Sequence, residues 1–148
     1  MTTPRMIFVN LPVADLERSK AFYEALGFRN EPKFSNDAAA MMVLSDTISV
    51  MLLTHPFYGS FTSRPIADAH ATSQVMLCIS CESRGEVDKI TNAAAAAGGK
   101  VDQSLRSETE GGPMYGRDFE DPDGHQWEPM WMDPEFAAQG AHPVEAAA

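Results

Sequence analysis

The segment Phe119–Glu128, with the sequence FEDPDGHQWE, decides how the rest of the chain is interpreted. Its centre, Asp-Pro-Asp-Gly, is typical of a tight turn, because proline restricts φ, aspartate bonds nearby backbone and glycine accepts positive φ. Strand-forming residues flank the turn at 114–119 and 126–131, so we predict a β-hairpin. Its second strand carries one carboxylate, Glu128, among apolar neighbours. Glu128 either lies on a solvated strand face or points into a pocket or at a metal.

The composition excludes several classes of protein. The 148 residues are 44% hydrophobic and 22% charged, which is typical of one globular domain or of two small fused modules. A formal net charge of −10, without a Lys/Arg cluster, disfavours nucleic-acid binding. Apolar runs are far shorter than the roughly 18 residues of a membrane span, and the start of the chain does not resemble a signal segment. We therefore expect a cytoplasmic protein that binds neither nucleic acid nor membrane.

Two cysteines form the Cys-x-x-Cys spacing of Cys78-Ile79-Ser80-Cys81. A closed zinc site needs about four ligands, and the sequence has no second cysteine pair. We expect one thiol to be buried as a small hydrophobe and the other to be free.

The first half of the chain predicts a strand, a helix and three further strands. Residues 6–11 alternate as a half-buried strand does, Asp15 offers a helix N-cap, and Gly27 supplies the helix C-terminus. Two polar turn segments then separate short apolar runs. The predicted elements span residues 6–11, 16–26, 28–34, 38–44 and 47–53.

The second half repeats this order. Ser83-Arg84-Gly85-Glu86 predicts a capping box that opens the second helix, which ends at Gly98-Gly99. The strands are predicted at 72–80, 100–105, 114–119 and 126–131. The result is an α+β fold of two tandem βαβββ modules, at 1–54 and 72–132, that must pair to cover their sheets.

Two segments lie outside the repeat. The loop 55–71 contains three aromatic residues, Phe57, Tyr58 and Phe61, which either cover a pocket or pack at the module junction. The alanine-rich tail 133–148 has no periodic pattern, so we expect it to be flexible.

Several motifs follow one another in a diagnostic order. They are Val13-Ala14-Asp15-Leu16 with Ser19, Phe22-Tyr23, Leu26-Gly27-Phe28, Ala97-Gly98-Gly99 and the segment 119–128. Together they resemble the vicinal-oxygen-chelate superfamily, which includes the glyoxalase I, bleomycin-resistance and extradiol-dioxygenase families. The resemblance covers about residues 6–132. It implies a glyoxalase-like fold, in which the modules form a curved mixed sheet around a cavity that is commonly completed in a homodimer.

Metal-using members of that superfamily place His or Glu ligands on the first and fourth strands of each module. By motif spacing, these positions fall on Phe8, Leu52, Gln74 and Glu128, of which only Glu128 is a good ligand. A catalytic divalent cation needs roughly three protein ligands, so we predict no metal at the customary site and no cofactor. His55 and Glu128 are the candidates for a relocated divalent metal, although using His55 requires a register shift that inverts the strand face.

Alternation outward from Glu128 predicts which residues line the cavity. They are Phe8, Asn10, Val50, Leu52, Gln74, Met76, Gln126, Glu128 and Met130. Asp118, on the strand that leads into the turn, is a further candidate whose register against Glu128 the sequence does not fix. Trp127 and Trp131 have the opposite parity and should pack beneath a helix. His125 is expected to be a surface or capping residue.

Three functions fit these observations. The first is a metal-free, bleomycin-resistance-like protein that binds a small aromatic or cationic molecule. The second is a metal-dependent glyoxalase-like lyase, isomerase or dioxygenase with a relocated metal, in which Glu128 is the candidate catalytic residue. The third is a non-catalytic dimeric scaffold.

Overall fold

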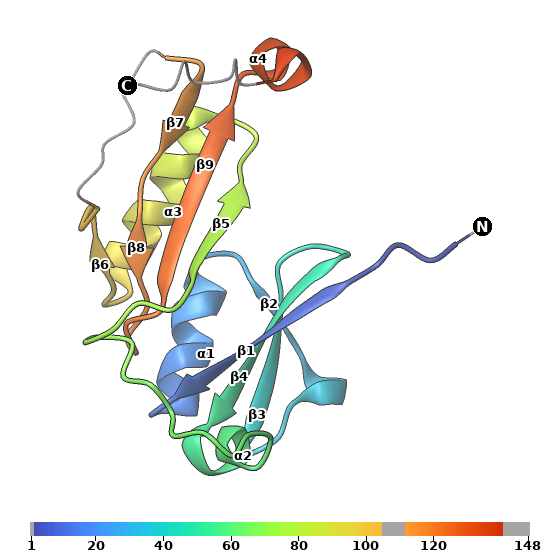
Figure 1. Ribbon diagram of the computed structural model, residues 1–148, viewed down its shortest axis with the longest axis vertical. Coiled ribbons are helices and arrows are strands. Elements are labelled where there is room, and N and C mark those ends of the chain that lie inside the picture. Colours follow the sequence, from blue (N-terminus) through green and yellow to red (C-terminus); the bar gives the residue numbers. More distant parts are fainter. Residues whose placement is uncertain (1, 105–111, 141–148) are drawn as a thin grey trace.

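The computed structural model describes residues 2–104 and 112–140, which form two modules in chain order (Figure 1). The first module consists of β1 (Ile7–Val13), α1 (Leu16–Ala25), β2 (Arg29–Glu31), the 3-10 turn η1 (Pro32–Phe34), β3 (Ala39–Val43) and β4 (Ile48–Thr54). The second consists of β5 (Met76–Ser80), α3 (Arg84–Ala96), β6 (Lys100–Val101), β7 (Met114–Gly116), β8 (Phe119–Glu120) and β9 (Gln126–Met132). The predicted α+β fold of two βαβββ modules is confirmed, with the third strand of the second module divided in two.

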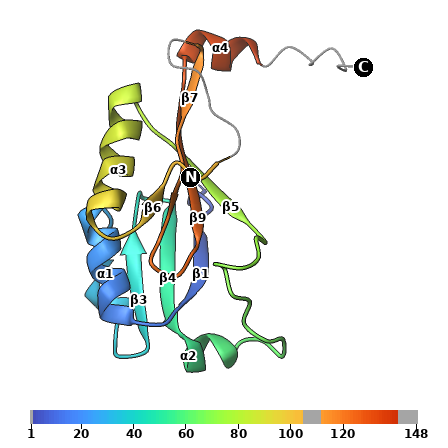
Figure 2. The same ribbon diagram turned by 90° about the vertical axis from the view of Figure 1, so that its left-hand side faces the viewer.

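Each module contributes a mixed sheet of its own. The strand orders are β1-β4-β3-β2 and β5-β9-β8-β6, with β7 also paired to β9. Helices α1 and α3 lie on the same side of the two sheets (Figure 2). We call the sheet surfaces turned away from these helices the open face. Strands β1 and β5 are edge strands, so the two sheets remain separate and open.

Both helices begin at the predicted caps. The Asp15 carboxylate accepts a hydrogen bond from the Arg18 amide at 3.1 Å, and the Ser83 hydroxyl accepts one from the Glu86 amide at 3.1 Å. These side chains satisfy backbone donors that have no partner within the helix. The Glu86 carboxylate reaches back to the amide of Glu82, one residue before the cap, at 2.7 Å.

The strand predicted at 114–119 is interrupted between β7 and β8. Pro129 lies opposite the interruption in β9, and its carbonyl accepts a hydrogen bond from the Arg117 amide at 3.2 Å. Proline has no amide hydrogen and cannot donate a second hydrogen bond to the neighbouring strand, so the regular pairing of the two strands is interrupted there. Asp118 instead accepts hydrogen bonds from the Gln103 and Ser104 amides, at 2.7 and 3.1 Å.

Other predicted segments also differ in detail. The loop predicted at 55–71 begins with helix α2 (His55–Gly59), and the predicted flexible tail begins with helix α4 (Pro134–Gln139). The strands predicted at 28–34, 72–80 and 100–105 are shorter, being reduced to β2, β5 and β6. Part of the tail, residues 141–148, lies outside the described residues. Among the described residues, no helix is both long and apolar enough to cross a membrane.

The two modules share one hydrophobic core. Tyr23 from α1 packs edge-to-face on Trp127 from β9, with ring centroids 5.9 Å apart, and Phe119 stacks on the same indole. Trp131, further along β9, lies 4.2 Å beneath the Arg84 guanidinium of α3. The predicted packing of both tryptophans on the helix side is therefore confirmed.

The predicted Asp-Pro-Asp-Gly turn fastens the second module to the first. The Asp123 carboxylate accepts hydrogen bonds from the Ala14 amide at 2.9 Å and the Ser19 hydroxyl at 3.2 Å. The Tyr23 hydroxyl donates to Asp121 at 2.6 Å. We call these contacts, with that of His125 described below, the inter-module clamp.

Candidate functional site

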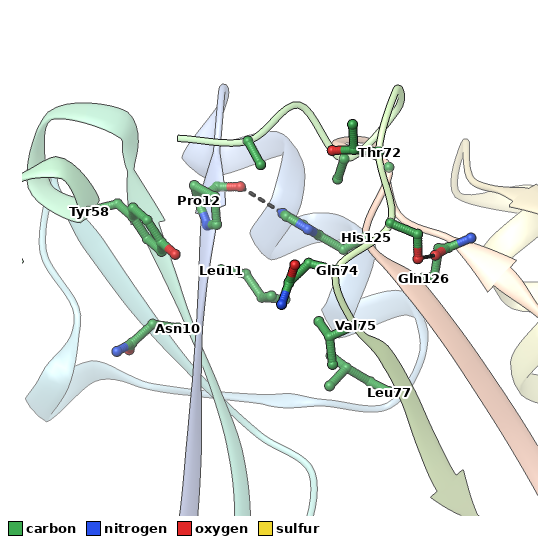
Figure 3. A pocket seen from close by; sticks show the side chains of 14 residues that line it. Asn10, Leu11, Pro12, Tyr58, Thr72, Gln74, Val75, Leu77, His125 and Gln126 are labelled. Carbon is green, nitrogen blue, oxygen red and sulfur yellow. Dashed lines mark hydrogen bonds between the residues drawn. The ribbon is translucent and has the colours of Figure 1, made fainter. Parts of the chain in front are cut away.

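A pocket of about 180 Å³ lies between β1 and the chain that leads into β5 (Figure 3). Its walls combine aliphatic groups with amides and hydroxyls. The lining residues are Asn10, Leu11, Pro12, Tyr58, Ala67, Ala69, Thr72, Ser73, Gln74, Val75, Leu77, Gly124, His125 and Gln126. Both modules and the segment between them contribute, so the pocket exists only when the modules are joined.

The clamp sets the width of this pocket. His125, one residue before β9, reaches the carbonyl oxygen of Pro12 near the end of β1, with Nε2 2.7 Å from that oxygen (Figure 3). A carbonyl oxygen can only accept, so Nε2 carries the proton. Neutral His125 thus has its acceptor at Nδ1, and its ring bridges the two modules. His125 is partly buried and structural, which differs from the predicted surface or capping residue.

Two other elements complete the walls. Helix α2 carries Tyr58 to the pocket, and Ser73 donates to the Gln126 side-chain oxygen at 2.5 Å, which holds the chain before β5 against β9. Gly124 in the turn has φ of 88°, and a Cβ there would meet the backbone and ring of His70. Glycine at this position therefore lets the inter-module segment lie directly on the turn.

Glu128 lies in a smaller hollow of about 60 Å³ on the second sheet. The hollow also contains Met76, Asp118 and Gln126, so Gln126 borders both cavities. The Asp118 oxygens are already bonded to two backbone amides. Glu128 pairs in register with Cys78, and burial followed by the Glu128 charge raises the pKa of that thiol.

The prediction that Leu52 lines the cavity is wrong. Leu52 is 0% exposed and pairs in register with Leu11, on the side of β4 that packs beneath α1. Val50 has the same parity and is also in the core. The alternate residues of β4 are Ser49, Met51 and Leu53, of which Met51 lies opposite Asn10.

Apart from Val50 and Leu52, the predicted binding residues fall into three groups. Asn10, Gln74 and Gln126 line the pocket of Figure 3, whereas Met76, Asp118 and Glu128 meet in the smaller hollow. Phe8 and Met130 lie beside them on the strands but outside both cavities.

Sequence reasoning missed most of the pocket wall. The sequence does not decide whether Tyr58 lines a pocket or packs at the module junction, and it does not indicate Thr72, Val75 or His125 as wall residues. The signal for Tyr58 was its place in an aromatic segment between modules. The role of His125 follows from a contact with Pro12, 113 residues earlier in the chain, which local pattern does not reveal.

The customary metal positions do not fit a divalent cation. Because Leu52 faces the core, we assign the fourth-strand position to its neighbour Met51, which lies opposite Asn10. The four positions are then Phe8, Met51, Gln74 and Glu128, a set with one carboxylate and two apolar side chains. Hard and borderline cations require several oxygen or nitrogen donors. The described residues contain no group of three or more His, Cys, Asp or Glu side chains able to hold a metal.

The structure does not bring His55 and Glu128 together. His55 borders a cleft of about 390 Å³ on the other side of the clamp, with His70, His125 and Asp123, whereas Glu128 lies in the small hollow of the second sheet. A relocated metal bound by both side chains therefore has no basis in this geometry.

Both cysteines are free thiols, and neither is buried, so the prediction of one buried cysteine is wrong. Partial burial, with Glu86 next in importance, raises the pKa of Cys81 to about 11. Thiols with raised pKa values are poor nucleophiles at neutral pH. Neither thiol therefore has the lowered pKa that a reactive Cys-x-x-Cys pair requires.

The sequence model of the glyoxalase/bleomycin resistance protein/dioxygenase superfamily matches residues 5–128. The chain belongs to this superfamily. The matched range extends from β1 through the clamp to Glu128, so it includes both modules. No curated protein matches the chain closely enough to count as a relative.

Several solved structures share the fold of this chain. The hypothetical protein SA1046 from S. aureus is 25% identical, with a TM-score of 0.70 over 88% of this chain and 95% of that chain. A glyoxalase/bleomycin resistance protein/dioxygenase family enzyme from Burkholderia phytofirmans is 18% identical, with a TM-score of 0.68 over 87% and 99% of the two chains. A superfamily protein from Nocardioides is 20% identical, with a TM-score of 0.66 over 98% and 91%.

Proposed function

We propose that this superfamily member binds a small organic molecule in the pocket of Figure 3 and that binding requires no metal. The observation that carries the proposal is the pocket itself, which combines aliphatic walls with a few hydrogen-bonding groups, as small-molecule sites do. The donor set at the customary metal positions supports a metal-free site, because it offers Glu128 as its one charged ligand. Metal-dependent lyase, isomerase or dioxygenase chemistry would need ligands that the described residues do not bring together.

The size of the pocket limits the ligand. A dry protein cavity of about 150 Å³ is large enough for benzene, and this pocket measures about 180 Å³. A single-ring compound with one or two polar substituents therefore fits better than a large multi-ring one.

A ligand screen tests the proposal. Purified protein treated with a chelator is mixed with a panel of single-ring compounds, and binding is measured by thermal shift and calorimetry. We expect at least one compound to raise Tm and to bind with a stoichiometry of one per chain. Val75→Trp, at a pocket residue whose side chain is exposed, should fill the space and abolish binding, whereas Gln139→Trp on exposed α4 should not. Binding that survives Val75→Trp, or an absence of binding across the panel, contradicts the proposal.

We also propose that two copies of the chain associate through their open faces. The support is that each edge strand exposes a large apolar side chain on this face, with Phe8 48% and Met76 58% exposed. Exposed apolar groups along unpaired strand edges are typical of surfaces that pair with another chain. A second copy would cover these side chains and border the pocket.

A further inference from the structure

The pocket of Figure 3 has no formally charged wall. Its fourteen lining residues include no Asp, Glu, Lys or Arg, although 22% of the whole chain is charged. The polar groups are instead the amides of Asn10, Gln74 and Gln126, the hydroxyls of Tyr58, Thr72 and Ser73, and the His125 imidazole. Carboxylates border the neighbouring hollows instead: Asp68, next to the lining residues Ala67 and Ala69, and Asp123 in one, and Glu128 in the other.

The polar groups that face the pocket are not all available to a ligand. The Gln126 oxygen is bonded to Ser73, and the His125 Nε2 proton is bonded to Pro12. By contrast, the described part of the chain supplies no recorded hydrogen-bond partner to the Asn10 and Gln74 side chains. The Gln74 amide lies between β1 and the chain leading into β5 (Figure 3). It offers both a donor and an acceptor at the centre of the wall.

We infer that the pocket selects an uncharged, single-ring ligand that both donates and accepts hydrogen bonds, such as a primary amide. This inference rests on the proposed function and names the class of ligand for the same site. Of the aromatic or cationic ligands that the sequence allowed, it favours an uncharged aromatic one. A charged group placed here would lose hydration and find no opposite charge on the wall, whereas a neutral amide would pair with Gln74 and place its ring on Val75 and Leu77.

Three compounds of nearly the same shape test the inference. Benzamide is neutral at pH 8, benzamidine is a cation and benzoate is an anion. Calorimetry with wild-type protein should show benzamide binding at least tenfold more tightly than either ion. Equal affinities, or tighter binding of an ion, would overturn the inference.

A charge introduced on the wall should reverse the preference. Gln74 is exposed, so Gln74→Glu should fold, and we expect it to bind benzamidine at least tenfold more tightly than wild type does while weakening benzamide. Asn10→Asp, at a second exposed position in the wall, should likewise strengthen the binding of benzamidine relative to benzamide. Gln139→Glu makes the same change of net charge on α4, away from the pocket, and should leave the wild-type order intact. If Gln74→Glu and Asn10→Asp both keep the wild-type order of affinities for the three compounds, the uncharged wall does not select the ligand by charge.

The outcomes separate this inference from the proposed function. If all three compounds bind equally and Val75→Trp blocks each of them, the pocket binds small molecules but does not select by charge. If none of the three compounds and no member of the wider panel binds, the proposed function fails together with the inference.

Discussion

Asp121 is 3% exposed, yet it belongs to a surface turn. Its carboxylate accepts hydrogen bonds from the Tyr23 hydroxyl and from the amides of Asp123 and His125. Burial nevertheless outweighs these hydrogen bonds and raises the pKa of Asp121. The clamp therefore includes a carboxyl group whose ionisation the folded protein opposes.

The raised pKa predicts how Asp121 contributes to stability as pH changes. The folded state holds the proton more strongly than the unfolded chain, where an aspartate titrates near about 3.9. Relative to Asp121→Asn, the wild-type free energy of unfolding should thus be most favourable below pH ~4. That advantage should fall as pH rises through the folded-state pKa, by about 1.4 kcal/mol for each pH unit separating the two pKa values. Urea unfolding of wild type and Asp121→Asn between pH 3.5 and 8 measures this difference in the free energy of unfolding.

A second aspartate, Asp102, serves as a control, because its contribution to the free energy of unfolding should change with pH in the opposite direction. Hydrogen bonding to Arg117 lowers the pKa of Asp102, so the advantage of wild type over Asp102→Asn should be present at neutral pH and lost as pH falls. Asparagine tolerates the left-handed φ of 56° found at Asp102. If the Asp121 advantage also grows with rising pH, the hydrogen bonds outweigh burial and the assigned cause is wrong.

Residue positions in the site could be predicted from sequence only where alternation was visible. Asn10 in the middle of β1, Gln74 just before β5 and Gln126 at the start of β9 are polar residues on the strand face predicted from Glu128, and all three border one pocket. The face on which Leu52 lies could not be predicted, because β4 is apolar on both faces: Leu52 and Leu53 are both buried. A strand covered on both sides has no polar face from which its parity can be inferred.

At the scale of elements, α3 is joined to β6 by a very close approach. A Cβ on Gly99 would collide with the Glu120 carbonyl, would lie 2.9 Å from the Phe22 ring and would lie 3.0 Å from the Ala94 carbonyl. Two of these atoms are backbone and cannot move aside independently. Gly99 therefore lets the end of α3 rest on β8 and on the first module at once.

Two glycine-to-alanine changes should have opposite effects on the free energy of unfolding. Gly99→Ala should destabilise the protein by about 2 kcal/mol or more, since overpacking forces the backbone to shift. Gly85→Ala, in the first turn of α3, meets only the Ser83 hydroxyl at 3.7 Å and should stabilise by about 0.5–1 kcal/mol. Urea denaturation gives both values. A neutral Gly99→Ala would mean that β8 and α3 are not tightly packed.

Helices could be predicted more accurately than strands, for a physical reason. Caps at Asp15 and Ser83 are local signals, and both helices begin one residue after them. Strand ends depend on the partner strand: β7 and β8 separate because Pro129, on β9, cannot donate a hydrogen bond. Sequence shows the proline but not what lies opposite it.

At the scale of the whole molecule, the open face predicts the oligomeric state. Light scattering coupled to size exclusion should give wild type twice the chain mass of 16.1 kDa. Phe8→Glu combined with Met76→Glu should give the mass of one chain, because charges would then lie along both edge strands. Ala95→Glu, exposed on helix α3 on the opposite side, should stay dimeric. A monomeric wild type would show that the exposed apolar edges serve another purpose.

The clamp also has a consequence for synthesis on the ribosome. The Ala14 amide and the Asp123 carboxylate that accepts its hydrogen bond are separated by 109 positions, and Trp127, which packs on Tyr23, is made later still. Helix α1 emerges early but cannot acquire these partners until the last strand has left the exit tunnel. A nascent chain stopped before β9 would expose the aromatic face of α1, so quality-control proteases should distinguish incomplete chains from complete ones by that surface.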